Sequence, residues 1–304
     1  MPKLEDAPIE KSHAEPVGIL RGRFGESAIW SESDKGVWWV DMHGHSVNFS
    51  GIEGDSRLWK TPGPELPWAR AVLLKEGGGL IVALSDKLAS FDAVSGEYTP
   101  LPLDLNLPRG HLFNDAIVDP AGRIIIGTML PGRGNDGQAA FFIIDHDLSA
   151  RLLVDGLNTT NGLAFSPDGQ TLYYSDSYVE VRKVWAADYD AATGTIGAPR
   201  LFIDFSGLPG KPDGAAVDSD GGYWSAAMAS PYLHRFTADG QLDLSYHLPI
   251  DTPTRPTFGG KGLSTLFLST GGLKDGEQDT GWKGALLSVE TSFCGTESVE
   301  ARLW

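Results

Sequence analysis

The sequence contains a single cysteine, Cys294, among 304 residues. One thiol can form neither an internal disulfide nor a cysteine-based zinc cluster, so both kinds of cross-link are excluded. No apolar run approaches the roughly 18 residues that a membrane span requires. No charged-then-apolar leader opens the chain either. We therefore expect a cytoplasmic protein that has no membrane partner.

Positive charge is also scarce. The chain has 24 Lys and Arg against 40 Asp and Glu, for a net charge of −16. Because phosphate backbones are bound by basic stripes and none is visible here, we expect no nucleic-acid partner. A Gly-x-Ser-x-Gly nucleophile elbow is absent too, so nothing in the sequence indicates a serine nucleophile.

No stretch shows a sustained helical period, whereas turn-forming residues are plentiful, with 38 Gly and 19 Pro. Six apolar, β-branched or aromatic runs each follow such a turn and lie 42 to 50 residues apart, centred near Val40, Val82, Gly127, Ser175, Ser225 and Leu268. This spacing is typical of four-stranded propeller blades, and a pair of β-sandwiches would not explain it. The sequence predicts an all-β, six-bladed β-propeller as one domain over residues 16–304, after a flexible N-terminal arm over residues 1–15.

Closure of the propeller can be predicted as well. We expect the last strand, around residues 285–289, to pair with residues that precede Glu26 in the same blade. Such pairing removes an exposed sheet edge. We expect a monomer.

Four short polar stretches precede four of these runs by nearly the same distance, 12 to 14 residues, and contain Glu26, Asn114, Asn161 and Asp213. In a propeller, residues at the same position within each repeat lie at the same level along the central axis. We therefore expect these side chains to converge near the axis. Glu26, Asn161 and Asp213 offer three oxygen ligands of the kind that hard divalent cations prefer, and three ligands leave positions open for water or substrate. The alternative is that Asn-Gly and Asp-Gly pairs serve only as turns.

Several ordered motifs resemble the family of gluconolactonase, regucalcin and the luciferin-regenerating enzyme. They are Gly25-Glu26-Ser27-Ala28-Ile29-Trp30 with Val40-Asp41, residues 114–123 with Gly127-Thr128-Met129, Asn161-Gly162-Leu163-Ala164-Phe165-Ser166 with residues 173–177, Pro212-Asp213-Gly214, and Phe258-Gly259-Gly260. The resemblance covers most of the chain.

The resemblance implies one divalent metal ion bound by Glu26, Asn161 and Asp213. Calcium or zinc is favoured over manganese, magnesium or iron. It also implies hydrolysis of a sugar-acid lactone, an aldono- or aldarolactone, in carbohydrate metabolism. Asp213 would then act as general base and acid, and Asn114 would touch the substrate. The alternatives are a calcium-binding propeller without turnover, or a hydrolase or lyase that acts on another cyclic ester.

The chain departs from the family where substrate would be recognised. Leu112 stands where family members often carry Arg, and a stretch that usually contains Cys is shortened to residues 254–257. Counting back 12 or 13 residues from the apolar runs of the two remaining blades, at Val82 and Leu268, gives Arg70 and Arg255. Because a guanidinium suits carboxylate or phosphate, we predict that Arg70 or Arg255, aided by His111, binds an anionic group of the substrate. The alternative is that these side chains are exposed or pair with local acids.

Overall fold

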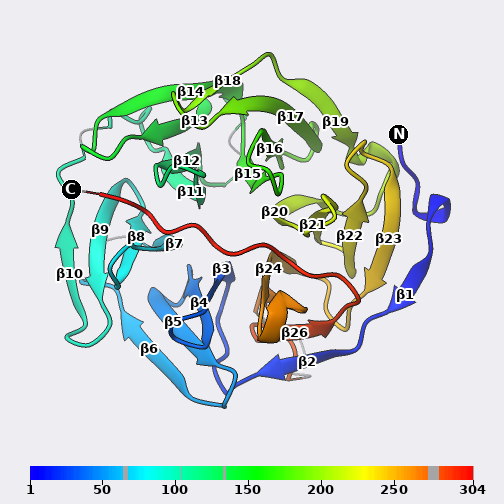
Figure 1. Cartoon of the computed structure of the whole chain (residues 1–304), viewed down its shortest axis with the longest axis horizontal. Coiled ribbons are helices and arrows are strands. Elements are labelled where there is room, and N and C mark those ends of the chain that lie inside the picture. Colours follow the sequence, from blue (N-terminus) through cyan, green and yellow to red (C-terminus); the bar gives the residue numbers. More distant parts are fainter. Residues whose placement is uncertain (64–67, 104, 133–134, 273–280, 304) are drawn as a thin grey trace.

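The computed structural model describes residues 1–63, 68–103, 105–132, 135–272 and 281–303. Six mostly antiparallel sheets surround a central axis, each with one strand close to the axis and the others farther out (Figure 1). The prediction of an all-β, six-bladed propeller is therefore confirmed. No helix among the described residues is both long and apolar enough to cross a membrane.

The first three blades follow one another along the chain, each running from its inner to its outer strand. Their strands are β3 (Gly25–Ser31), β4 (Gly36–Asp41), β5 (Ser46–Gly51) and β6 (Ser56–Lys60); β7 (Ala69–Leu74), β8 (Leu80–Leu84), β9 (Lys87–Asp92) and β10 (Glu97–Pro100); and β11 (Leu112–Val118), β12 (Ile124–Met129), β13 (Ala139–Ile144) and β14 (Ala150–Leu157).

The other three blades follow the same plan, with additions at their outer edges. Their strands are β15 (Thr160–Phe165), β16 (Thr171–Asp176), β17 (Lys183–Asp190), β18 (Thr195–Ile196) and β19 (Arg200–Asp204); β20 (Lys211–Val217), β21 (Tyr223–Met228), β22 (Tyr232–Phe236), β23 (Leu242–His247) and β1 (Ile9–Lys11); and β24 (Pro253–Gly259), β25 (Thr265–Thr270), β26 (Leu286–Glu290) and β2 (Ala14–Val17). Three short 3-10 helices complete the described structure: η1 (Leu4–Asp6), η2 (Phe205–Gly207) and η3 (Lys261–Leu263).

The turns behave as their residues dictate, and the link from β11 to β12 is an example. Oδ1 of Asp119 accepts hydrogen bonds from the backbone N–H groups of Ala121 and Arg123, at 2.9 and 2.7 Å. Gly122 has a φ of +92°, which lies in the region that glycine reaches without a steric penalty. The side chain and the glycine together reverse the chain within four residues.

The apolar core is divided among the blades. Among the described residues there are six buried clusters, and each lies between two neighbouring blades. One of them lies between the sixth blade and the first. Trp38 of β4, for example, is buried with Phe91 of β9 in the cluster between the first and second blades. Burial of this apolar surface holds neighbouring blades together and fixes the inner strands around the axis.

The two chain ends close the ring. Strand β2 pairs antiparallel with β26, from Ala14 opposite Val289 to Val17 opposite Leu286, so the predicted closure is confirmed. The expectation of a loose arm over residues 1–15 does not agree with the structure, because β1 also pairs, in parallel, with β23. The outer edge of the fifth blade offers free backbone groups, and this polar segment satisfies them.

Candidate functional site

All six inner strands carry a β-bulge near their first residues. The register with the next strand shifts between Glu26 and Ile29, Ala69 and Ala71, Phe113 and Ala116, Asn161 and Ala164, Pro212 and Ala215, and Pro253 and Pro256. A bulge inserts an extra residue and re-aims a side chain. The shift falls at Glu26, Arg70, Asn114, Asn161 and Asp213 in the first five blades, and at Thr254 and Arg255 in the sixth. The site residues therefore lie on the inner strands rather than in the loops that enter them.

Three of these residues form a continuous hydrogen-bonded chain from the second blade to the fourth. Nη2 of Arg70 donates to Oδ1 of Asn114 at 2.7 Å. Nδ2 of Asn114 donates to Oδ1 of Asn161 at 3.2 Å and to the carbonyl oxygen of Thr160 at 2.8 Å. Because these groups are neighbours, the structure brings Arg70, Asn114 and Asn161 together as the phase of the repeat predicts.

The amide of Asn161 is held in one orientation. Its Nδ2 donates to Oγ of Ser177 at 2.9 Å, and that hydroxyl donates to the carbonyl oxygen of Pro212. The nitrogen is thus committed to Ser177, and the oxygen accepts from Nδ2 of Asn114 at 3.2 Å. An amide oxygen has a second lone pair, which is available to a cation.

The carboxylates of Glu26 and Asp213 complete this group. Asp213 is buried, and its Oδ2 has no hydrogen-bond partner among the described residues. Burial raises the pKa of Asp213 to about 7, with a further contribution from Asp115. Burial, with the nearby Asp213 as the next cause, also raises the pKa of Glu26 well above its usual range. Arg255 lowers the pKa of both carboxyls and Lys211 lowers that of Asp213, but burial outweighs these charges, so a divalent cation would favour the ionised forms.

These residues fit a divalent metal ion. The described residues contain no group of three or more His, Cys, Asp or Glu side chains placed to hold one, so three protein ligands at this position would include a neutral oxygen such as that of Asn161. The buried Oδ2 of Asp213 has no partner among the described residues, and a hard cation would satisfy it and reduce the repulsion between the two carboxylates. Glu26, Asn161 and Asp213 stay the predicted metal ligands.

Arg255 lies on the inner strand of the sixth blade, and its guanidinium already has a carboxylate partner. It forms an ion pair with Asp115, and the side chains are only 11% and 5% exposed. Because the third and sixth blades face each other across the axis, this pair spans the channel. Oδ2 of Asp115 also accepts from the backbone N–H of Leu163 at 3.0 Å. The structure therefore agrees with the alternative in which Arg255 pairs with an acidic residue of the protein.

A glycine and a threonine explain where the Arg255 side chain goes. A Cβ atom on Gly214 would lie 2.8 Å from the carbonyl oxygen of Thr254 and would also collide with Arg255, so only glycine leaves this path open. The sixth inner strand instead turns Thr254 toward the first blade, where its hydroxyl donates to the carbonyl oxygen of Gly25 at 2.7 Å.

His111 is not joined to the site by any contact among the described residues. It is buried just before β11, and its Nε2 lies 3.0 Å from Oδ2 of Asp136. The hydrogen-bonded carboxylate gives His111 a partner of its own, so the predicted role in substrate binding lacks structural support.

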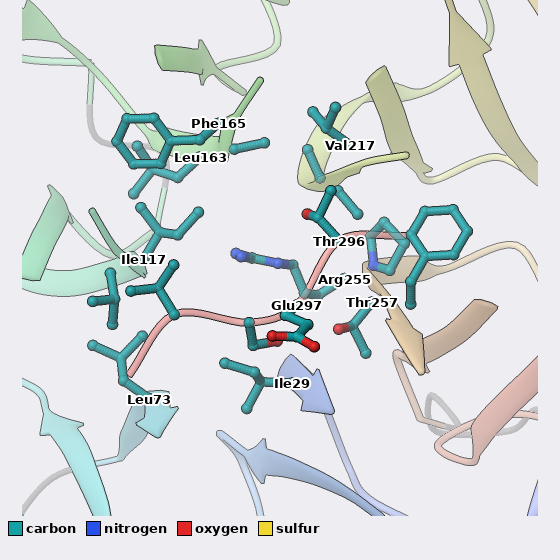
Figure 2. A pocket seen from close by; sticks show the side chains of 18 of the residues that line it. Ile29, Leu73, Ile117, Leu163, Phe165, Val217, Arg255, Thr257, Thr296 and Glu297 are labelled. Atoms are coloured by element: carbon teal, nitrogen blue, oxygen red, sulfur yellow. The ribbon is translucent and has the colours of Figure 1, made fainter. Parts of the chain in front are cut away.

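A cavity of about 290 Å³ lies beyond the ion pair, farther along the inner strands. Its walls are mainly apolar, and residues 296–299 cover it (Figure 2). Figure 2 shows Arg255 reaching into this space and Glu297 at its edge. The C-terminal segment that forms the cover crosses the centre of the ring (Figure 1). Neither Asp115 nor this cover was predicted from the sequence; the position of Asp115 directly after Asn114 on an inner strand was the available signal.

The covering segment is fastened at both ends. On one side, the backbone N–H of Ser219 donates to the carbonyl oxygen of Cys294 at 2.7 Å. On the other, the N–H of Ala301 donates to the carbonyl oxygen of Leu74 at 2.8 Å, and that of Arg302 to Gly122 at 2.8 Å. These anchors lie in the fifth, second and third blades, so the segment closes one end of the channel and the candidate site lies toward the other end.

Comparisons with known proteins agree with this geometry. Residues 24–272 match the model of the SMP-30/Gluconolactonase/LRE-like region. A pentonolactonase of Haloferax volcanii is 29% identical over 280 residues, covering 90% of this chain and 92% of the relative. A 6-deoxy-6-sulfogluconolactonase of Pseudomonas putida is 33% identical over 247 residues, covering 81% and 82%. The solved structure of a calcium-binding protein, regucalcin, from Agrobacterium tumefaciens superposes with a TM-score of 0.88 at 23% identity, covering 98% of this chain and 100% of that one.

Proposed function

Since the chain belongs to the SMP-30/gluconolactonase/LRE-like family, we propose that it is a metal-dependent lactonase that opens the ring of a sugar-acid lactone by hydrolysis. Relatives named as a pentonolactonase and a 6-deoxy-6-sulfogluconolactonase support this class of substrate. The observation that carries the proposal is the buried Oδ2 of Asp213, which has no partner among the described residues and lies next to a second carboxylate.

Glu26, Asn161 and Asp213 would hold one divalent ion, with calcium or zinc favoured. The structurally similar regucalcin of Agrobacterium tumefaciens is named as a calcium-binding protein, which supports a divalent ion of this kind. When bound, such an ion polarises the lactone carbonyl and makes water more acidic. Ser177 keeps the amide oxygen of Asn161 directed at this position. A monomer and a cytoplasmic location remain predictions from the sequence.

Asp213 is the proposed general base and acid. Without a metal ion, burial raises the pKa of its carboxyl to about 7; a bound divalent cation would hold Asp213 ionised, which is the form that can accept a proton from water. It takes a proton from the attacking water as oxygen bonds to the carbonyl carbon. It returns the proton to the ring oxygen as the ester bond breaks, and the product is the open-chain hydroxy acid.

Asn114 is the proposed substrate contact beside these ligands. Its amide is fixed by Arg70, Asn161 and the carbonyl oxygen of Thr160, and the bond to Asn161, a proposed metal ligand, supports this role. A rigid polar group orients a bound lactone without a further loss of entropy. Arg255 and His111 are left out of this proposed site because each already has a carboxylate partner.

The test is a lactone panel assayed with metal-stripped protein, to which each divalent ion is added back singly. We expect proton release only with a metal present and a loss of about 10²- to 10⁴-fold in Asp213→Asn. Asp155→Asn makes the same chemical change at an exposed site and should keep full activity. Tight metal binding without turnover of any lactone would instead favour a binding protein.

A further inference from the structure

Arg70 is buried but has only uncharged partners. It is 4% exposed. Its Nε donates to the carbonyl oxygen of Phe113 at 2.7 Å, and its Nη2 donates to Oδ1 of Asn114 at 2.7 Å and lies 3.1 Å from the sulfur of Met129. Two of the three nitrogens therefore position the guanidinium, and neither of them neutralises its charge.

The other buried arginine behaves differently. Arg235 is 7% exposed and pairs with Asp218, at 2.7 Å from Nε to Oδ2, and with Asp243. Arg70 forms no ion pair with any carboxylate in the described part of the chain, and burial lowers its pKa to about 10. Because an isolated buried charge is costly, one that persists without a partner calls for a compensating anion.

The position of Arg70 shows where that anion would come from. Arg70 lies on the second inner strand, between Glu26 of the first and Asn114 of the third. Its Nη1 has no hydrogen-bond partner among the described residues and is not one of the fully buried polar atoms without a partner. Glu26 attracts Arg70 electrostatically without pairing with it, and in the proposed function Glu26 is committed to the metal ion.

The charges point to an acidic substrate. Asp115 and Arg255 cancel each other, and a divalent ion would cancel Glu26 and Asp213, which leaves the positive charge of Arg70 in the site. Asn114 has already donated both of its N–H groups, to Thr160 and Asn161, so the unused hydrogen-bond donor beside it is Nη1 of Arg70. A free donor on a positively charged group favours an anionic substituent near Arg70.

We infer that Arg70 recognises a carboxylate carried by the lactone in addition to the ester it hydrolyses, so that the preferred substrates are lactones of sugar diacids. The inference rests on the proposed lactonase function and names its substrate class. Nη1 of Arg70 donates to the carboxylate, and the bonds to Phe113 and Asn114 hold the guanidinium ready for it.

A matched pair of substrates tests the inference: D-glucaro-1,4-lactone and D-glucono-1,4-lactone share a ring and differ in a carboxylate against a hydroxymethyl group. The wild type should open the acidic lactone with a kcat/KM at least tenfold higher. In Arg70→Gln, both lactones lose the support that Arg70 gives to Asn114, but kcat/KM for the acidic lactone should fall about 10- to 100-fold further than kcat/KM for the neutral one. Arg70→Lys, which keeps the charge but loses the planar fork, should retain part of the preference.

Arg182→Gln is the control, because Arg182, like Arg70, has uncharged hydrogen-bond partners among the described residues, the carbonyl oxygens of Gly210 and Phe205, and lies outside this group of residues. It should leave the ratio of the two substrates unchanged. If the wild type has equal kcat/KM values for the neutral and the acidic lactone, the inference is wrong and the lactonase function stands. An equal loss on both substrates in Arg70→Gln also overturns it, since Arg70 would then only position Asn114. A wild type that opens neither lactone with any ion refutes the proposed function itself, and the inference with it.

Discussion

The ion pair between Arg255 and Asp115 lets the arrangement of the channel be tested without any substrate. The two side chains reach each other from opposite blades and are 11% and 5% exposed. Exposed ion pairs contribute up to about 1 kcal/mol, whereas removing one partner of a buried pair costs about 3–5 kcal/mol, because a buried charge is left uncompensated. The burial places this pair in the second class.

The perturbation is Arg255→Met, Asp115→Asn and the double variant. Arg255→Met leaves Asp115 with one backbone hydrogen bond, from Leu163, and should destabilise the protein by about 3–5 kcal/mol. Asp115→Asn strands the guanidinium and should cost a similar amount. The double variant removes both charges and should return to within about 1–2 kcal/mol of the parent, because the penalty of each single change comes from the charge left behind.

Thermal and urea unfolding in the presence of a chelator measure these differences. A chain of 304 residues has an unfolding entropy of about 0.6 kcal/mol/K, so each single variant should lower Tm by about 5–8 °C. Strict additivity in the double variant, or single costs below about 1 kcal/mol, would refute the view that Arg255 and Asp115 form a buried pair. A loss of substrate preference in Arg255→Met, with Arg70 intact, would show that Arg255 recognises the anionic group after all.

Three further predictions concern other parts of the molecule. Ser177→Ala frees the amide of Asn161 and should weaken calcium or zinc binding by about 10- to 100-fold in calorimetric titrations. The metal-free protein should lose about 2–5 °C in Tm, because the buried partners in Asn161 and Pro212 are left without a hydrogen bond. Burial lowers the pKa of His234 to about 4 in the folded protein, so as the pH falls the unfolded chain is protonated at this residue before the folded protein is. The contribution of neutral His234 to the free energy of unfolding is therefore complete above pH 6.5 and about 2 kcal/mol smaller at pH 5. Urea unfolding of His234→Gln should lack this part of the acid-dependent loss, and an identical pH profile would contradict the reasoning. Ala301→Asp places a charge in the cluster between the second and third blades and should destabilise by at least about 3 kcal/mol in the same assay, whereas Val299→Asp, in the exposed part of the same segment, should change stability by no more than about 0.5 kcal/mol.

The repeat made most of the fold predictable. A period of 42 to 50 residues identified the six blades because each blade must repeat one pattern of buried and turn residues. The phase within the repeat also predicted that Arg70, Asn114 and Asn161 would be neighbours, and that Glu26 would lie near Asp213. The sequence did not reveal that β1 pairs with β23, because a polar segment of three residues carries no strand pattern.

The sixth blade shows where counting fails. The count chose Arg255, whereas the strand turns Thr254 to the first blade and sends Arg255 across the channel to Asp115. The bulges differ in detail from blade to blade, and a shift of one residue sends a side chain in another direction. The partner of Arg255 is 140 positions away in sequence, so no local pattern could have announced the pair.

The division of labour among the blades explains how substrate preference can change while the chemistry stays. The proposed metal ligands come from the first, fourth and fifth blades, through Glu26, Asn161 and Asp213. Arg70 and Asn114 come from the second and third, and they touch the ligand set through a single amide contact, from Asn114 to Asn161. Each blade contributes its residue at a bulge whose backbone is held by its own sheet and by apolar contacts to its neighbours. A substitution at position 70 therefore alters the charge that faces substrate without moving the carboxylates that bind metal, and this separation is why an arginine at that position is expected to govern selectivity rather than catalysis itself.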